Sequence, residues 1–219
     1  DCVFIENEAY GDYGAINRGS STRCTFIRNR SITGNGSAIG GVNSAADNCV
    51  FIGNVSSNYL DNGALRIRNC LLISNVSYSA TSPITYLTPV NCTLIGNRTD
   101  GAGIVRSGAS NCIFNGNYPK DSNGGTLSYC IYETEGTSAS KSILTSDPGF
   151  NMGQNPKLAW YAPSRRSPAR DAGAEQSWAT SETLDVAGNP RLNGAIDIGC
   201  YEYHNMGVQT ILRVCLLYT

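Results

Sequence analysis

The chain carries almost no net charge and contains few of the residues that build long helices. Its 219 residues include 16 lysines and arginines against 17 acidic residues, which leaves a formal net charge of −1 and a pI of about 5.8. This balance argues against a basic nucleic-acid-binding surface and against a charged membrane-surface patch. The only lysines are Lys120, Lys141 and Lys157, so long amphipathic helices and coiled coils are not expected.

Long apolar stretches and clustered metal ligands are also missing from the sequence. No run of about 18 apolar residues occurs, so no membrane-spanning helix is predicted. Residues 207–219 are apolar but short and are interrupted by Arg213, and we expect the tail of residues 205–219 to lie outside the core. No Cys-x-x-Cys pair is present and His204 is the single histidine, so neither a metal site nor a cofactor is predicted.

What the sequence does contain is a cysteine-marked repeat of about 21 residues. An aromatic residue or a leucine stands two positions after each cysteine, and an asparagine stands five positions after it. The copies are marked by Cys2, Cys24, Cys49, Cys70, Cys92, Cys112 and Cys130. The asparagines are Asn7, Asn29, Asn54, Asn75, Asn97 and Asn117, and the seventh copy has Glu135 at this position.

A repeat of this length with short β-prone pieces predicts a parallel β-helix over residues 1–146. Leucine-rich repeats share the period, but the leucines that they need at several fixed positions are absent. Coils about 4.8 Å apart would stack the cysteines inside as small apolar side chains. The asparagines would form a ladder at a turn, because asparagine tolerates left-handed backbone angles and its amide can bond to the next coil. Disulfides and a metal site are the alternatives for the cysteines, although adjacent parallel strands fit disulfide geometry poorly.

Four ordered motifs after the repeat carry a resemblance to a known family. They are Ser146-Asp147-Pro148-Gly149-Phe150, Ser167-Pro168-Ala169-Arg170-Asp171-Ala172-Gly173, Asp185-Val186-Ala187-Gly188-Asn189-Pro190-Arg191 and Ile196-Asp197-Ile198-Gly199-Cys200-Tyr201-Glu202-Tyr203. They resemble the ending of choice-of-anchor Q domain proteins, from which Arg170 and Val186-Ala187 depart. The F-x-x-N pieces, such as Phe51 to Asn54, and the G-A-[IL] pieces, such as Gly14-Ala15-Ile16, resemble the right-handed parallel β-helix repeats of polymorphic outer membrane proteins.

The resemblance implies a right-handed coil and an extracellular or bacterial cell-surface location more than it implies any chemistry. The first residues already belong to the repeat, so we expect the export signal to precede this sequence.

Residues 147–204 lack the cysteine repeat and are expected to form a separate, irregular region. A solenoid exposes the strand edges of its last coil, so a terminal cap is needed there. The aromatic side chains available to cover the open core are Trp160, Tyr161, Trp178 and Tyr201. The residues expected to brace the cap through ion pairs are Asp171, Asp185, Arg191 and Asp197.

Polysaccharide lyases and glycoside hydrolases use the same fold, but the fold alone does not establish an activity. The best candidate pair of catalytic carboxylates is Glu133 and Glu135, which would lie about 6.6 Å apart on one face of a strand. The pair falls in the degenerate seventh copy of the repeat, where an exposed loop edge is the simpler interpretation.

Two arginine pairs are candidate contacts for an acidic glycan, namely Arg66 with Arg68 and Arg165 with Arg166, beside Arg170. Solvated faces and salt bridges are the alternative interpretation. Exposed tyrosines could stack on sugars, and the candidates are Tyr10, Tyr13, Tyr59 and Tyr86. Equivalent repeat positions also predict surface ion pairs between adjacent coils, Glu6 with Arg28 and Glu8 with Arg30.

The sequence therefore favours a non-enzymatic, extracellular or cell-surface β-helix that acts as an adhesin-like or glycan-binding scaffold. One alternative is the C-terminal part of a carbohydrate-active enzyme, either a polysaccharide lyase or a glycoside hydrolase, and another is a structural spacer. The expected partner is a polysaccharide or a cell-surface glycan rather than a nucleic acid, and a monomer is expected.

Overall fold

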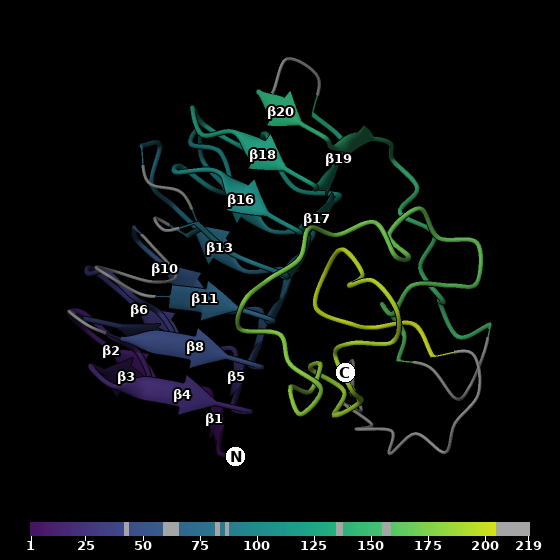
Figure 1. Ribbon diagram of the computed structural model, residues 1–219. Helices are drawn as coiled ribbons and strands as arrows, with labels where there is room; N and C mark the ends of the chain where they lie inside the picture. Colours follow the sequence, from purple (N-terminus) through teal and green to yellow (C-terminus); the bar gives the residue numbers. More distant parts are fainter. Residues whose placement is uncertain are drawn as a thin grey trace.

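A computed structural model confirms an all-β fold in which the chain winds as a right-handed parallel β-solenoid (Figure 1). The structure describes residues 1–41, 44–58, 66–81, 84–85, 88–134, 138–154 and 159–204. Within these ranges every regular element is a strand, and each turn of the solenoid takes about 22 residues. Nothing in the described part of the chain is a helix long and apolar enough to cross a bilayer.

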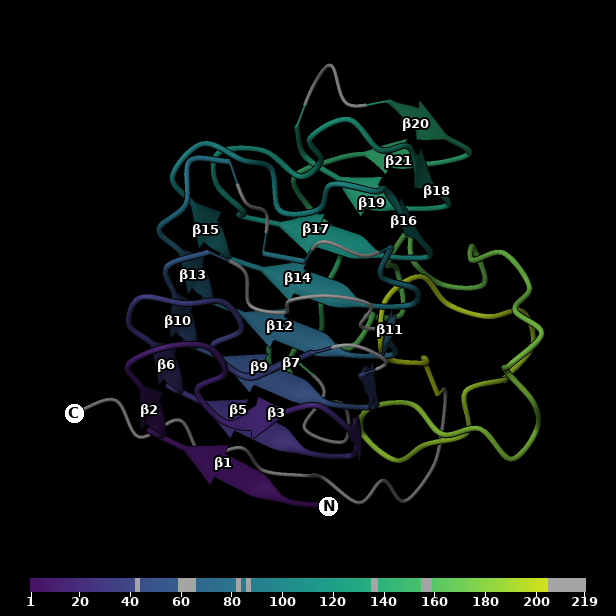
Figure 2. The same cartoon turned by 90° about the vertical axis from the view of Figure 1, so that its left-hand side faces the viewer.

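The central element is an eight-stranded parallel sheet, to which successive coils contribute one strand each (Figure 2). Its strands, in spatial and chain order, are β1 (Val3–Ile5), β5 (Thr25–Ile27), β9 (Val50–Ile52), β12 (Leu71–Ile73), β14 (Thr93–Ile95), β17 (Ile113–Asn115), β19 (Ile131–Tyr132) and β21 (Ile143–Leu144). The pairing keeps repeat positions in register, so that Phe4 lies beside Phe26 and Phe26 beside Phe51.

Shorter parallel sheets form the other sides of the coil. One has five strands, β2 (Glu8–Ala9), β6 (Arg30–Ser31), β10 (Val55–Ser56), β13 (Val76–Ser77) and β15 (Arg98–Thr99). Two have three strands, β4 (Ser20–Thr22), β8 (Ala45–Asp47) and β11 (Arg66–Arg68), then β16 (Ala109–Ser110), β18 (Leu127–Ser128) and β20 (Ala139–Ser140). The last of these sheets has two strands, β3 (Ile16–Asn17) and β7 (Ile39–Gly40).

The cysteines stack inside the solenoid as free thiols. The backbone N–H of Cys49 lies 3.3 Å from Sγ of Cys70, and the contact recurs from coil to coil as far as Cys130. In the following coil Ser142 takes the cysteine position and accepts the N–H of Cys130 at 2.9 Å, a copy of the repeat that the sequence reading missed. The eight described cysteines form no disulfide, and all except Cys2 are buried.

Aromatic and aliphatic side chains fill the interior beside the thiols. The rings of Phe4, Phe26 and Phe51 stack nearly parallel, with centroids 5.0 and 4.9 Å apart. Leucine occupies the same position in the next two coils, and Phe114 follows them at zero exposure. Burial of these side chains is the main source of stability, because each removes a large apolar surface from water.

Two sharp corners flank most strands of the eight-stranded sheet, and each of these corners uses one residue with a left-handed backbone. The first corner residue directly precedes the cysteine position, with φ between 50 and 54° at Arg23, Asn48, Asn69, Asn91, Asn111, Tyr129 and Lys141. The second precedes the repeat asparagine, with φ between 49 and 62° at Glu6, Arg28, Gly53, Ser74, Gly96 and Gly116. The repeat asparagine itself is therefore not the left-handed residue that the sequence reading expected. It directly precedes the next strand, and it contributes to the turn through its side chain.

The repeat asparagines form a continuous hydrogen-bonded ladder, which we call the asparagine ladder. The backbone N–H and Nδ2 of Asn54 both donate to Oδ1 of Asn75 at 3.0 Å, and Asn75 donates to Asn97 in the same way. Nδ2 of Asn75 also donates to the carbonyl of Phe51 at 3.0 Å. Because Asn75 is completely buried, these bonds replace water for groups that would otherwise have no partner.

The described parts of residues 147–204 contain no regular strand and cover the side of the solenoid, not the open end that the sequence predicted them to cap (Figure 1). Tyr201 and Tyr203 pack with Val50, Leu71 and Ile73. Ile198 packs with Ile113 of β17 and Ile131 of β19. The physical reason is that the outward face of the eight-stranded sheet is itself apolar, so it has to be covered. Of the aromatic residues expected over the open core, Tyr201 and Tyr161 instead contact this outward face, while Trp160 remains 56% exposed.

Asparagines at the first corner attach this C-terminal region to the coils. Nδ2 of Asn69 donates to the carbonyl of Leu184 at 2.9 Å, and Nδ2 of Asn91 donates to that of Asp197 at 3.1 Å. Asn111 makes a reciprocal pair, donating to the carbonyl of Ala174 at 2.7 Å and accepting its N–H at 2.8 Å. The Asn-Cys dipeptide of the repeat thus has two functions, since the cysteine fills the interior and the asparagine binds the outer layer.

We predict that Asn75→Ala lowers the free energy of unfolding by about 3 kcal/mol, because it leaves several buried polar groups without partners. Urea unfolding followed by circular dichroism measures the loss. Asn7→Ala is the matched control at the exposed end of the ladder, and its cost should stay below about 1 kcal/mol. Equal losses in the two variants would contradict the conclusion that the buried part of the ladder stabilises the fold by satisfying buried polar groups.

Alkylation should distinguish the interior thiols from Cys2. Burial raises the pKa of Cys70, Cys92 and Cys112 well above the usual thiol value, so the reactive thiolate is both rare and inaccessible. We predict that iodoacetamide modifies Cys2 in the native protein and modifies these three cysteines only after unfolding in urea. Peptide mass spectrometry locates each label, and rapid native labelling of Cys92 would show that the interior is not dry.

Candidate functional site

Glu133, one of the two candidate catalytic carboxylates, supports a corner of the coil. Its carboxylate accepts hydrogen bonds from Nδ2 of Asn115 and from the backbone N–H of Gly116, the latter at 2.9 Å. Its own N–H donates to the buried Asp121 at 2.9 Å. Glu135 lies outside the described residues. A carboxylate held by two donors in this way is poorly placed to exchange protons with a substrate.

The four candidate glycan-binding arginines form two separate pairs, one on β11 and one in the C-terminal region. Arg66 and Arg68 of β11 both bind the carboxylate of Asp47, at 2.7 and 2.8 Å. Arg68 is also covered by the ring of Trp178, 4.6 Å from the guanidinium carbon. Arg165 and Arg166 are exposed in the C-terminal region, and the structure shows no ion pair for either within its described part. The structure therefore does not assemble a joint arginine site for an acidic ligand.

The C-terminal region contains a buried cluster of charged groups centred on Arg191. Its Nη1 lies 3.5 Å from Oε2 of Glu202, and its Nη2 donates to the carbonyls of Asp197 and Gly199 at 2.7 and 2.6 Å. The Asp197 carboxylate accepts the N–H groups of Asp171 and Tyr203, both at 2.6 Å. Asp185 accepts the N–H of Glu202 at 3.0 Å. All four predicted bracing residues therefore meet here or alongside, but mostly through hydrogen bonds to the backbone and not through ion pairs with one another.

Burial raises the carboxyl pKa values of this cluster. The pKa of Glu202 rises to about 8 and that of Asp197 to about 6, and the pKa of Asp185 is also raised. Such shifts can mark functional sites. Here each carboxylate belongs to a residue that is 2% exposed, so no substrate can reach it, and the cluster acts as a brace for the C-terminal region. The structure reveals no group of three or more side chains placed to hold a metal ion within the ranges that it describes.

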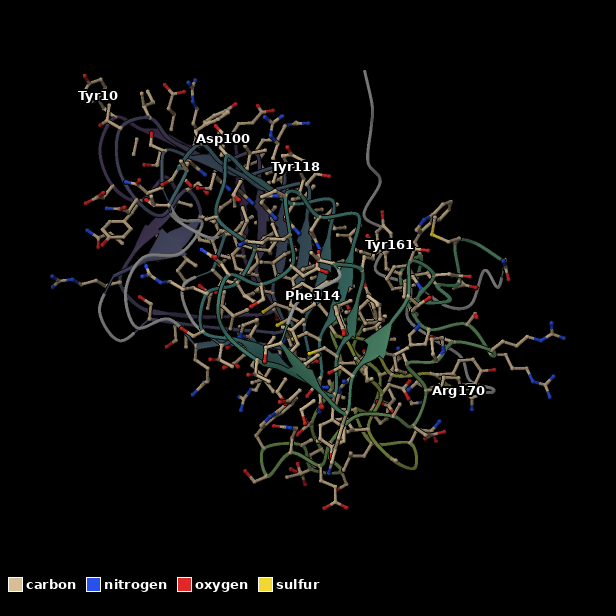
Figure 3. The ribbon with its side chains drawn as sticks, turned by 90° about the horizontal axis from the view of Figure 1, so that it is seen from above. Tyr10, Asp100, Phe114, Tyr118, Tyr161 and Arg170 are labelled. Carbon is tan, nitrogen blue, oxygen red and sulfur yellow. The ribbon has the colours of Figure 1, made fainter. Side chains whose placement is uncertain are left out.

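The surface best suited to binding is the outward face of the five-stranded sheet. Three tyrosines project from it or from the residues that follow its strands: Tyr10 at 77% exposure, Tyr78 at 61% and Tyr118 at 62%. We call this surface the tyrosine face. Figure 3 looks along the stack of coils and places Tyr10 and Tyr118 at one outer edge, with Phe114 inside and Arg170 on the opposite side.

The sheet sets the order of residues along the tyrosine face. One outward column passes through Glu8, Arg30, Val55, Val76, Arg98 and Tyr118, as the parallel register shows. Tyr10 and Tyr78 each stand two residues after a member of this column, Glu8 and Val76, so they point to the same outward face. The inward residues between them, such as Ser31 and Ser77, are buried. The regular backbone therefore fixes the positions of the three rings.

Neighbouring charges on the tyrosine face are paired with each other. Glu8 contacts Arg30 at 3.4 Å, as the repeat predicted, and Arg98 contacts Asp100 at 3.3 Å. The guanidinium carbon of Arg98 also lies 6.0 Å from the ring centre of Tyr118, the outer limit of a cation–π contact. A second predicted pair, Glu6 with Arg28, forms nearby at 2.6 Å. The face thus offers aromatic rings on a surface with little excess charge.

Sequence reasoning identified only part of this surface. Of the four tyrosines predicted to be exposed, Tyr10 is exposed and Tyr13 is half-buried. The other two, Tyr59 and Tyr86, lie outside the described residues. Tyr78 and Tyr118 were missed. The signal was present, because they stand three positions after Asn75 and one position after Asn117, and odd offsets from the inward asparagine point outward in a strand.

Comparison with protein-family models, curated proteins and solved structures returns no match for this chain. The resemblance to choice-of-anchor Q domain and polymorphic outer membrane proteins therefore rests on the sequence motifs, while the structure independently establishes the β-solenoid.

The buried carboxyl groups predict a stability that falls as the pH rises. A raised pKa means that the folded state holds its proton more tightly than the unfolded chain does. This stabilisation is complete below the unfolded pKa of about 4.5 and is lost as the pH rises through the folded value of about 8 for Glu202. The free energy of unfolding should therefore decrease between pH 5 and about 8, with a slope of up to about 1.4 kcal/mol per pH unit for each such carboxyl.

Urea titrations at successive pH values measure this slope. In Glu202→Gln, which cannot titrate, the slope between about pH 6 and 8 should become smaller. An unchanged slope in that variant would exclude Glu202 as its source.

Proposed function

We propose that this protein is a non-enzymatic, extracellular or cell-surface scaffold that binds glycans through the tyrosine face. The observation that carries the proposal is the set of three exposed tyrosine rings that follow or extend the strands of one sheet. Tyrosine offers a large, rigid and amphipathic contact surface, and a tyrosine at a fixed position loses little conformational entropy when it binds. The C–H faces of sugar rings are complementary to such aromatic surfaces, and the phenolic hydroxyls add hydrogen bonds.

The solenoid contributes rigidity to this proposed function. The backbone of each tyrosine is bonded to a neighbouring coil: the N–H of Tyr78 donates to the carbonyl of Ser56, that of Tyr118 donates to the carbonyl of Asn97, and the carbonyl of Tyr10 accepts the N–H of Thr33. A preorganised surface loses little entropy when it binds a ligand. The proposed mechanism is therefore presentation of a rigid face, without making or breaking a covalent bond.

The proposed location and adhesin-like role come from the motif resemblance, which links the chain to surface proteins. The alternative of a carbohydrate-active enzyme gains no specific support from the described residues. The perturbed carboxylates are buried within the C-terminal region, and Glu133 is held at a corner. The binding proposal is therefore the one that the exposed groups favour.

Affinity electrophoresis tests the proposal directly. We predict that the native protein is retarded in gels containing at least one of four soluble polymers: mannan, xylan, mixed-linkage glucan or polygalacturonate. Tyr78→Ala and Tyr118→Ala should each weaken retention by about two- to tenfold, since a stacked aromatic contact contributes about 0.5–1.5 kcal/mol. Trp160→Ala is the control, because it removes an equally exposed aromatic ring from the C-terminal region. The tyrosine face would be rejected as the binding site if neither tyrosine variant changed the retention. It would also be rejected if none of the four polymers retarded the native protein.

A further inference from the structure

We infer that the ligand of the tyrosine face is a linear, uncharged polysaccharide that lies across the strands, parallel to the axis of the solenoid. This inference rests on the proposed function and adds the direction and the chemical class of the ligand. It follows from the positions of the three rings relative to the strands and from the pairing of the charges between them.

The tyrosines are spread along the stack rather than along a strand. Tyr10 follows β2 and Tyr78 follows β13, which is three strands further along the sheet. Tyr118 lies two strands beyond β13, because it pairs with Arg98 of β15. At about 4.8 Å per strand, the rungs of Tyr10 and Tyr78 are about 14 Å apart and those of Tyr78 and Tyr118 about 10 Å apart. Each strand of this sheet has only two residues, so a ligand lying along a strand could meet one ring at most.

The described residues between the rings have short side chains or carry charges that are paired with each other. Val55 and Val76 occupy the outward column between Arg30 and Arg98, and both are half-buried. The row from Tyr10 to Tyr78 runs two residues beside this column, and in it the two intervening coils hold Ile32 and Ser57, which are also half-buried. A chain that rests on the two rings would therefore meet no long side chain between them. Each guanidinium on the path already has a carboxylate partner, Arg30 with Glu8 and Arg98 with Asp100. Recognition of an acidic polymer would require guanidinium groups free to form bidentate bonds to its carboxylates.

The spacing predicts how affinity depends on ligand length. A short oligosaccharide can reach only the closer pair, Tyr78 and Tyr118, whereas a longer one also reaches Tyr10. Affinity should therefore increase from the disaccharide onward and level off once the ligand spans all three rings, as expected for contacts that are joined in one ligand. Tyr118→Ala should weaken short and long oligosaccharides alike, and Tyr10→Ala should weaken only the long ones.

Isothermal titration of the full chain tests this with manno-, xylo- and mixed-linkage gluco-oligosaccharides of graded length, and with oligogalacturonides as the acidic arm. We expect a neutral series to bind with a gain of about tenfold or more from the shortest to the longest member, and Tyr10→Ala to remove about two- to tenfold from the longest alone. Val55→Lys places a long side chain directly beside the proposed path, between the rungs of Tyr10 and Tyr78, and should also weaken only the long ligands. Ser140→Lys is its control, at an exposed position on β20 of a different sheet.

Affinity independent of length, or an equal loss for the shortest ligand in Tyr10→Ala, would overturn the axial direction while leaving glycan binding intact. Preferential binding of oligogalacturonides would overturn the uncharged class. Absence of binding to every series, together with no retention in the polymer gels, would instead reject the proposed function itself.

Discussion

The asparagine ladder is the interaction on which the rest of the structure depends. Each coil has to turn sharply next to a dry interior, and at the turn the backbone groups can reach neither water nor the regular sheet bonds. The buried amides of Asn54 and Asn75 provide the missing partners, with one oxygen accepting from both the backbone and the side chain of the preceding coil. Because every amide is both donor and acceptor, the ladder fixes the register of successive coils. That register then stacks the thiols and the phenylalanines and aligns the outward columns.

The same register makes both faces of the eight-stranded sheet apolar. Inside, Phe26 and Phe51 stack on each other, while outside Leu71 and Ile73 need a cover. The C-terminal region supplies this cover, and its two means of attachment differ in kind. Apolar contacts give most of the burial, whereas the corner asparagines, such as Asn111 bound to Ala174, specify where each loop lies. The buried Arg191 and Glu202 then give this loop-rich layer a defined interior in place of regular strands.

The remaining sides of the solenoid differ in how much they leave for a partner. The side formed by β4, β8 and β11 is partly occupied, because Arg68 contacts both Asp47 and Trp178. The side formed by β2, β6, β10, β13 and β15 keeps its tyrosines exposed and its charges paired. Binding through this face would use the rigidity that the ladder creates, and it would leave the interior and the C-terminal layer unchanged.

The repeat by itself determined the coil, its period and the identity of the stacked residues, because each repeat position meets the same environment in every turn. Cys49, Phe51 and Asn54 could be assigned from one copy and extended to the others. The register also contained Tyr78 and Tyr118, although recognising them required knowing which offsets from the asparagine point outward. Only the tertiary structure decided where residues 147–204 lie. The open end of the solenoid and the outward face of its main sheet both require cover, and stacking of the coils is what joins Val50, Leu71 and Ile73 into one continuous apolar surface. The sequence alone cannot show which of these two surfaces buries more apolar area under the C-terminal region, because neither surface exists until the coils are stacked.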